Sequence, residues 1–540
     1  MLRIAWRLQR AGVIGMSAFG VVYGYIQAAA YGKAAGATAA SRIALGHQLE
    51  AFGRTYSWIL PLPVRVDTVS GYVQWRIYGA LPFLFAIWAL IAATGATRGD
   101  EDHGLVEVWL SSPVGPGRYI ATRFQAFALA ALIAVVATSA TIRLTIAGLG
   151  YSLDLPAVAG DSVALLALTL VCYGLCMALA QFASRRASAV GLSGIVLAVL
   201  FFVNSLGRTD AGLRAVAAVI SPFYHLDRST PLTPGGAFDL GATIGLFAGA
   251  FVVTALAAWL MTIRDIGSPL LRRGRREHAV THVPARNRLL RVPVLSTLYE
   301  RRLGLLGWTL GASIGAAYMP TVGRSIVDLS SKGGSFAAYL AVVGGSDPYV
   351  ALTGYIWFGV FQLALVALAL IWVARWSADD SEGRLEMELS APVSRRWVVA
   401  ERALAFVATA VVVITVSSVV LYLAAAADHI HIHADDLAVA SVALLPFVLS
   451  FAAIGAALTS LVPRAAIAVL ATIAFLSYLI TEGGPLFKWP DWVMKLSVFS
   501  LYGTPLTRGI YWTGFWILLA ITVAGFGAAT LLMERRDVGR

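Results

Sequence analysis

The chain has 540 residues, of which 59% are hydrophobic and only 13% are charged, and its formal net charge at pH 7 is +12. Soluble globular domains carry about 25% charged residues, so this composition excludes an ordinary soluble protein. The basic residues gather in short loops beside apolar runs, where they act as topology signals. The positive charge therefore indicates a membrane protein and argues against nucleic acid as a partner.

Apolar runs long enough to cross a bilayer recur along the whole chain. Residues 1–10 are predicted to form a short interfacial helix ahead of the first span. In the first half, the predicted transmembrane helices are residues 11–31, 77–97, 122–147, 160–183, 187–206 and 238–262. In the second half, they are residues 303–322, 354–375, 400–425, 437–461, 465–481 and 511–533. The predicted fold class is an all-α membrane protein of about twelve transmembrane helices.

A charged stretch separates the two halves. Residues 264–302 contain ten Arg as well as Pro and Gly, which indicates a cytoplasmic linker. The first transmembrane unit is then residues 1–263 and the second is residues 303–540. With the N-terminus inside, about two thirds of the 41 Lys and Arg residues fall on the cytoplasmic side. Both termini are therefore predicted to be cytoplasmic.

One stretch of the first half repeats in the second without a gap. Residues 100–127 align with residues 379–406 and share eleven identical positions. We therefore predict two parallel six-helix repeats related by an axis along the membrane normal. The best-matched part is the cytoplasmic loop between the second and third helices of each half, residues 100–114 and 379–393.

The pattern of this loop predicts a short helix. Its acidic start is typical of a helix N-terminus. Leu105, Val108 and Trp109 are spaced to form an apolar stripe, with Glu107 on the other side, and Pro113 then ends the helix. A solvated connector with an interfacial helix is the alternative, but loops usually diverge faster than the elements they join. We therefore predict a docking surface in each half.

The loop pattern resembles the coupling helix of type-2 ABC exporter permeases. Over its whole length, the chain is similar to two fused permease units of the polyketide-antibiotic (tetronasin-type) and multidrug exporters. The resemblance implies a multi-pass permease of the bacterial inner (plasma) membrane that exports hydrophobic compounds such as antibiotics or drugs. It further implies that two copies of a separate ATPase subunit power export, with ATP and Mg bound there and no cofactor in this chain.

The resemblance also implies which loop residues contact the ATPase. They are Asp100, Glu101, Gly104, Glu107, Leu110 and Pro113 in the first copy, and Asp379, Asp380, Gly383, Glu386, Leu389 and Pro392 in the second. The family favours a basic residue just after the proline. The second copy has Ser394-Arg395-Arg396 there, whereas the first has Gly115-Pro116-Gly117, so the first contact is expected to differ.

The chain has no motif for binding ATP itself. A Walker A motif requires Gly-Lys followed by Ser or Thr. The lysines are Lys33, Lys332, Lys488 and Lys495, and only Lys33 follows a glycine, with Ala after it. We therefore predict that the chain is not an enzyme and that any ATP drive comes from another polypeptide.

In the resembling family, the translocation path lies between the second and fifth helices of both units. The matching positions are Phe83, Trp88, Phe201, Phe202, Asn204, Trp357, Phe361, Gln362, Phe475 and Tyr478. Each aromatic side chain could instead face lipid or the core. The two amides are stronger candidates because a polar group in lipid usually turns inward. An aromatic cavity with few charges suits large apolar molecules.

Two further segments carry aromatic residues and a proline just before the last helix of each half, residues 214–231 and 489–505. In the family, short helices at this place form an outer gate, although Trp and Tyr also favour membrane interfaces in general. His429, His431 and His433 alternate in a predicted outer loop. They are weak candidates for a zinc or copper site, against the alternative of a polar turn, so no metal site is predicted.

Two other function classes remain open. An ion-driven secondary drug transporter of twelve helices usually needs acidic residues inside the membrane, and no acidic residue is predicted well inside a span. A membrane-embedded transferase would use an acidic cluster to hold metal and phosphate. The duplication of the acidic runs at residues 100–102 and 379–380 fits two docking sites better than one active site.

Overall fold

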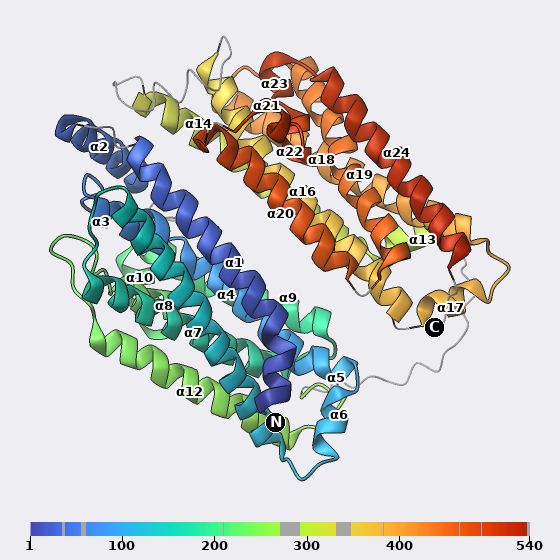
Figure 1. The fold of residues 1–540 in the computed structure, drawn as a ribbon, viewed down its shortest axis with the longest axis horizontal. Coiled ribbons are helices and arrows are strands. Elements are labelled where there is room, and N and C mark those ends of the chain that lie inside the picture. Colours follow the sequence, from blue (N-terminus) through green and yellow to red (C-terminus); the bar gives the residue numbers. More distant parts are fainter. Residues whose placement is uncertain are drawn as a thin grey trace. The chain divides into compact units, whose positions relative to one another are not determined.

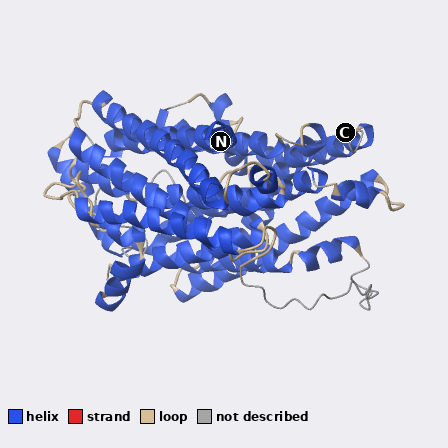
Figure 2. Cartoon of the chain, turned by 90° about the horizontal axis from the view of Figure 1, so that it is seen from below, coloured by secondary structure: helices blue, strands red, loops and turns tan. Residues whose placement is uncertain are grey.

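Helices and their connecting segments make up all the described residues (Figure 2). The computed structural model describes residues 2–34, 38–55, 61–208, 210–270, 292–330, 347–381, 383–463, 465–487 and 489–536. Eleven of the described helices are long and apolar enough to cross a membrane. The prediction of an all-α membrane protein is confirmed. The chain divides into unit 1, Met1–Ala279, and unit 2, Val280–Arg540, which are described separately.

Unit 1 begins with α1 (Leu2–Ala34) and α2 (Ala39–Thr55) (Figure 1). A long helical run from residue 69 to residue 102 follows, with a turn at residues 79–80, made of α3 (Val69–Tyr72), η1 (Val73–Tyr78), α4 (Leu81–Thr94), η2 (Gly95–Gly99) and α5 (Asp100–Asp102). The remaining helices are α6 (Leu105–Leu110), α7 (Pro116–Gly148), α8 (Leu155–Ala180), α9 (Arg186–Gly207), α10 (Ala211–Ile220), α11 (Pro222–Asp227) and α12 (Leu240–Ile263). The interfacial segment predicted at residues 1–10 is the start of α1, which runs through it without a break.

Small residues let the helices of unit 1 approach closely. The helix α1 packs along α7, and α8 packs against both α4 and α12. A Cβ atom on Gly20 of α1 would meet Thr138 Oγ1 of α7 at 2.0 Å, and one on Gly174 of α8 would meet Thr254 Oγ1 of α12 at 2.6 Å. Because lipid tails are as apolar as side chains, such close packing holds membrane helices together.

Unit 2 repeats this kind of helical packing. Its helices are α13 (Pro293–Glu300), α14 (Arg302–Ser330), α16 (Pro348–Ser381), α17 (Arg384–Leu389), α18 (Arg395–Ala427), α19 (Ala434–Leu461), α20 (Ala466–Phe487), α21 (Asp491–Met494), α22 (Val498–Tyr502), α23 (Pro505–Arg508) and α24 (Trp512–Arg535). The helix α19 packs against α24 and α16, and α14 packs against α16 and α18. The predicted span 303–322 is the helix α14, but α14 contains Pro320 and is not among the eleven apolar spans.

The predicted linker, residues 264–302, is described only at its two ends. Its middle, residues 271–291, lies outside the described residues. At one end, the backbone N–H of Leu270 donates to the carbonyl of Gln181 at 3.0 Å, within unit 1. At the other end, α13 packs against α18 of unit 2. Each described end therefore packs on its own unit.

Candidate functional site

A glycine with positive φ begins the short loop helix in each unit. Gly104 has φ of +69° and precedes α6, and Gly383 has φ of +71° and precedes α17. In this left-handed conformation glycine avoids the steric cost of a Cβ atom. The long helical run that ends in α5 can therefore turn sharply into α6. This requirement explains why glycine occurs at the same position of both repeats.

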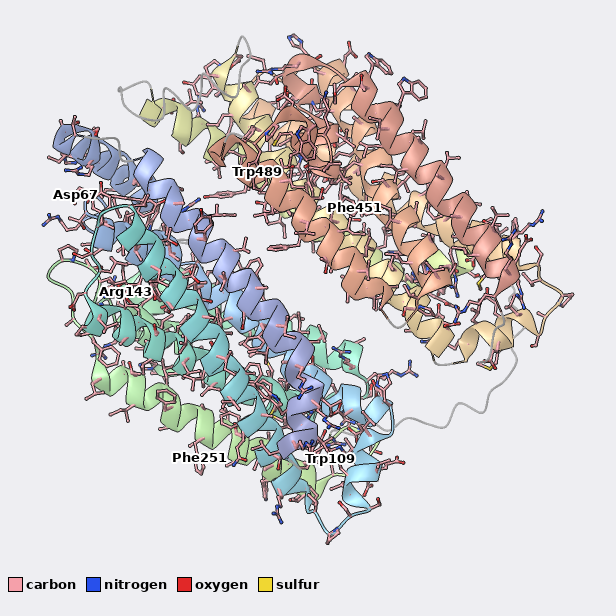
Figure 3. All side chains as sticks on the ribbon, viewed as in Figure 1. Asp67, Trp109, Arg143, Phe251, Phe451 and Trp489 are labelled. Atoms are coloured by element: carbon pink, nitrogen blue, oxygen red, sulfur yellow. The ribbon has the colours of Figure 1, made fainter. Side chains whose placement is uncertain are left out.

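The face that α6 turns toward unit 1 differs from the predicted one. Val106 is 1% exposed and Trp109 is 7% exposed, and the Trp109 ring meets the Tyr119 ring of α7 edge to face at 5.4 Å. Leu105 is 38% exposed and Val108 is 68% exposed. The predicted apolar stripe of Leu105, Val108 and Trp109 is therefore wrong. Trp109 lies at one end of unit 1, and Arg143 lies toward the other end (Figure 3).

The outward faces of α6 and α17 carry the same pattern. Glu107 and Glu386 are exposed, and among the described residues neither carboxylate has a hydrogen-bond or ion-pair partner. Val108 and Met387 follow them at equivalent positions, and each is 68% exposed. Each unit therefore presents a carboxylate beside an apolar side chain that its own packing does not use. Leu110 and Leu389 are half-buried at the helix ends, and Pro113 and Pro392 are exposed beyond them.

The acidic start of the loop has a different role from the predicted one. Residues 100–102 end the long helical run rather than beginning the loop helix. The Asp100 carboxylate lies 2.5 Å from Arg123 Nη2 and accepts a hydrogen bond from Tyr119 at 2.8 Å. At the equivalent place in unit 2, the Asp379 carboxylate lies 3.4 Å from Arg402 Nη2. The prediction that these aspartates lie at a helix N-terminus is wrong.

The second acidic residue of each copy is also paired within its own unit. Glu101 lies 3.0 Å from Arg98 and 2.7 Å from Arg264, and all three side chains are at most 4% exposed. In unit 2, Asp380 lies 2.7 Å from Arg536, which follows α24 as Arg264 follows α12. These contacts fix the loop to the last helix of its unit. Glu107 and Glu386 remain as the exposed acidic residues of α6 and α17 themselves.

The basic residues after the second loop contact the chain's own last helix. The guanidinium of Arg395 donates to the carbonyls of Met533 at 3.1 Å and Arg536 at 2.5 Å. Arg396 forms an ion pair with Glu534. Carbonyls at a helix C-terminus have no partner within the helix, so a cation there is stabilising.

In α17, the pKa of Glu388 lies above its ordinary value because the carboxyl is partly buried, and the nearby Arg402 only partly offsets this effect.

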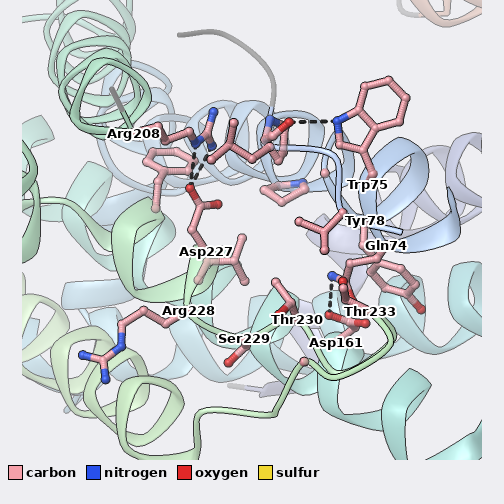
Figure 4. Close-up of a pocket in the computed structure, with 18 of the residues that line it drawn as sticks. Gln74, Trp75, Tyr78, Asp161, Arg208, Asp227, Arg228, Ser229, Thr230 and Thr233 are labelled. Carbon is pink, nitrogen blue, oxygen red and sulfur yellow. Dashed lines mark hydrogen bonds and ion pairs between the residues drawn. The ribbon is translucent and has the colours of Figure 1, made fainter. Parts of the chain in front are cut away.

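A cavity of about 490 Å³ opens in unit 1 (Figure 4). It lies beside α3, at the end of the unit away from α6 (Figure 1). Its walls come from the start of the long run, from α8, from the end of α9, and from α11 with the segment after it. Of the predicted path residues, Phe201 and Asn204 line it. The Asn204 amide donates to Asp227 at 2.9 Å, so its polar group is satisfied inside the cavity wall.

The other predicted path residues of unit 1 lie elsewhere. The Trp88 ring packs on the Phe127 ring at 4.8 Å, inside the core of the unit. Phe83 is 49% exposed and Phe202 is 45% exposed, and neither lines the cavity. Trp88 occupies the core position that the sequence left open as an alternative. The structure adds Gln74 and Asp161 to the cavity wall, which the sequence did not single out.

Unit 2 has a cavity of about 450 Å³ built from equivalent parts, namely the start of α16, the end of α20 and the short helices before α24. Gln362 and Tyr478 line it. Trp357 and Phe361 do not, because their rings stack at 4.7 Å in the core of the unit. Phe475 is half-buried and lies outside the lining. In both cavities, the short helices occur where the sequence predicted the gate segments.

Two family models match the chain, one in each unit. A model described as ABC-2 family transporter protein matches residues 16–231. A second, described as the C-terminal domain of the multidrug efflux system permease Rv1217c, matches residues 290–533. The two matches support an ABC-2 type transporter permease. A comparison with curated proteins finds no match.

The family assignment confirms the resemblance that the repeated loop indicated. The permease is a membrane transport component rather than a catalytic subunit. With its apolar helices it is a multi-pass protein, which in bacteria places it in the plasma membrane. The two family matches fall in different units, so each unit of the permease carries its own family signature.

The alternating histidines of the permease lie on the surface of unit 2. Ile430 is 3% exposed and Ile432 is 5% exposed, and both face the core. His429, His431 and His433 point the other way and are exposed. Among the described residues, no group of three or more His, Cys, Asp or Glu side chains gathers closely enough to hold a metal ion. The apolar partners thus explain the alternation.

Proposed function

We propose that the permease is the membrane subunit of an ATP-driven exporter of hydrophobic compounds such as antibiotics or drugs. Two copies of a separate ATPase would power it, one on each unit. The observation that carries this proposal is the matched outward pair on the loop helices, Glu107 with Val108 and Glu386 with Met387. A carboxylate beside an exposed apolar side chain fits a groove with a basic rim and an apolar floor.

The long helical run offers a mechanical route from the docking surface to the cavity. In unit 1, the run from residue 69 to residue 102 carries Gln74 and Tyr78 in the cavity wall and ends beside α6. The buried pairs of Asp100 and Glu101 join the far end of this run to α7 and to the segment after α12. Movement of α6 would therefore be transmitted to several helices together, which is what coupling requires.

Unit 2 has the same route. The helix α16 carries Gln362 in its cavity wall and ends at the acidic pair Asp379 and Asp380, beside α17. Both cavities expose more apolar than polar surface, as sites for hydrophobic small molecules do, although the lining in unit 1 also contains charged side chains. Two equivalent routes support two ATPase copies.

Co-purification tests this proposal. The permease would be expressed with the ATPase encoded beside its gene, and the subunit ratio measured in mild detergent. We expect one permease with two ATPase subunits. The double variant Glu107→Lys and Glu386→Lys should lower the bound ATPase by about tenfold or more, because charge reversal at an interface repels the partner. The exposed Glu300 of α13 lies outside the repeat, and Glu300→Lys is the matched control.

An unchanged subunit ratio in the double variant, with the control also unchanged, would exclude α6 and α17 as the docking surfaces. One observation favours the ion-driven alternative. Asp161 lies in the first third of α8 and is 4% exposed, so it is a candidate for the buried acidic group that an ion-driven carrier uses. If the permease alone moved a substrate in proteoliposomes under an ion gradient, the ATP-driven proposal would be replaced by that alternative.

A further inference from the structure

The cavity of unit 1 contains a buried carboxylate that lacks a cationic partner. Asp161 is 4% exposed and lines the cavity. Its Oδ1 accepts a hydrogen bond from the Gln74 side chain at 2.9 Å, whereas no group of the described residues donates to its Oδ2. Gln74 in turn accepts from the backbone N–H of Leu232 at 3.0 Å. The Gln74 amide is therefore held by a hydrogen bond on each side, and it fixes the position of the carboxylate at the cavity wall.

The arginines of the cavity are engaged elsewhere. Arg208 lies 2.8 Å from the Asp227 carboxylate. Arg228 lies 2.8 Å from Asp239, and Arg214 donates to two backbone carbonyls at 3.0 Å. Figure 4 shows Asp161 and Gln74 across the cavity from the pair of Arg208 and Asp227. Among the described residues, Asp161 is thus the lining carboxylate without an ion-pair partner.

Burying a charge is costly unless it is paired and hydrogen-bonded. An arrangement that holds a carboxylate in an apolar wall with one oxygen unsatisfied favours a ligand that brings a positive charge and an N–H donor. The same wall contains the aromatic rings of Trp75, Tyr78, Phe201 and Phe223. Such rings accommodate the apolar body of a ligand and also attract cations.

We infer that the cavity of unit 1 binds amphiphilic organic cations, with the protonated amine paired to Asp161 and the apolar body against the aromatic rings. The inference narrows the substrate class of the proposed exporter and rests on that proposal only for the step of transport. Binding itself requires no ATPase. Among the described residues that line the cavity of unit 2, the one carboxylate is that of Glu482, which is an exposed residue. We therefore place the cation site in unit 1.

Equilibrium dialysis with the full chain in zwitterionic lipid nanodiscs tests the inference, with empty nanodiscs subtracted. The probes are naphthylethylamine, which is a cation at neutral pH, and naphthylethanol, which is neutral and nearly the same shape. We expect the permease to bind the amine about tenfold or more tightly than the alcohol, because loss of a buried charge partner has at least this effect. Asp161→Asn should remove the preference by weakening amine binding, with the alcohol little changed.

Asp154→Asn is the matched control. Asp154 caps the N-terminus of the same helix through the backbone N–H of Ala157, lies outside the cavity lining, and asparagine caps equally well. This variant and Asp161→Glu should keep the preference for the amine. Equal binding of the two probes by the wild type, or a preference that persists in Asp161→Asn, overturns the inference. Should Asp161→Asn fail to fold, the wild-type comparison decides.

The assay contains no ATPase, so its result is independent of the docking proposal. If the permease binds the amine through Asp161 but never associates with an ATPase, the cation site is supported and the ATP-driven proposal is contradicted. If the permease associates with two ATPase subunits but binds both probes equally, the ATP-driven proposal is supported and the cation site is contradicted.

Discussion

Asp100 and Asp379 occupy equivalent positions in the two units, but their surroundings differ. The Asp100 side chain is 11% exposed and faces an Arg123 side chain that is 4% exposed. The corresponding values are 23% for Asp379 and 16% for Arg402, and the distance between the charged atoms is longer, 3.4 Å against 2.5 Å. Water screens the second pair more than the first. Identical residues at identical positions of the repeat therefore contribute differently to stability.

We predict that Asp100→Asn lowers the free energy of unfolding by about 3 kcal/mol, because it leaves the buried Arg123 without its counter-ion. Asp379→Asn should lower it by about 1 kcal/mol or less, because a more exposed pair is worth less. Thermal unfolding of the purified variants in one detergent measures the difference as a larger drop in midpoint for Asp100→Asn. Glu107→Gln, at an exposed site, is the control. Equal drops for the two aspartate variants would show that exposure does not separate the two pairs.

At the scale of the element, the sequence predicted the existence of the loop helix but not its orientation. Pro113 and Gly104 mark its two ends, and both are visible in the sequence as punctuation. The helix α6 has only six residues, which is fewer than two turns. So short a helix has too few apolar positions for helical spacing to define a face. Its face is set instead by the fit of Trp109 against Tyr119, a tertiary contact.

The same limit applies to the acidic residues and to the cavity. Glu101 pairs with Arg264, which lies 163 residues away in the sequence, and no local pattern indicates that contact. Asn204 and Gln362 were predicted to face inward from their polarity alone, and both line cavities. Fewer of the aromatic candidates line a cavity, because Trp and Phe pack equally well in a core or against lipid. Polarity within a span was therefore the more informative signal.

The hinge glycines lead to a prediction about the loop helices as elements. A Cβ atom on Gly104 or Gly383 would meet nothing within 4 Å, so an alanine there fits sterically but is strained by its positive φ. Gly104→Ala and Gly383→Ala together should reorient α6 and α17 at a cost of about 1–2 kcal/mol for each helix. The expected result is less ATPase recovered with the permease at normal permease yield.

The matched control is Gly115→Ala. Gly115 has φ of −69° and also has nothing within 4 Å of its Cβ position, so alanine is unstrained there. It should leave ATPase recovery unchanged. If the hinge variants recovered as much ATPase as the control, the left-handed conformation would have no part in presenting the docking surfaces.

At the scale of the whole molecule, each unit contains a complete set of parts. Each has a loop helix with an outward carboxylate, a long helix that ends in buried or half-buried ion pairs, and a cavity at the far end of that helix. The units differ in the surroundings of these parts, as the two aspartate pairs and the buried carboxylate of Asp161 illustrate. If both outward faces dock an ATPase as proposed, the two units share the drive for transport, while their unlike cavities recognise different ligands.

This division leads to a prediction about stoichiometry. If the two surfaces dock independently, Glu107→Lys alone should yield a permease that holds one ATPase subunit, and Glu386→Lys alone should do the same. Each variant removes the attraction at one surface and leaves the other intact. Native mass spectrometry would measure the ratio of ATPase to permease subunits. Nucleotide-free complexes are used so that ATP does not promote direct binding between the two ATPase copies. A single variant that loses both subunits would show that the second ATPase binds through the first rather than through its own unit.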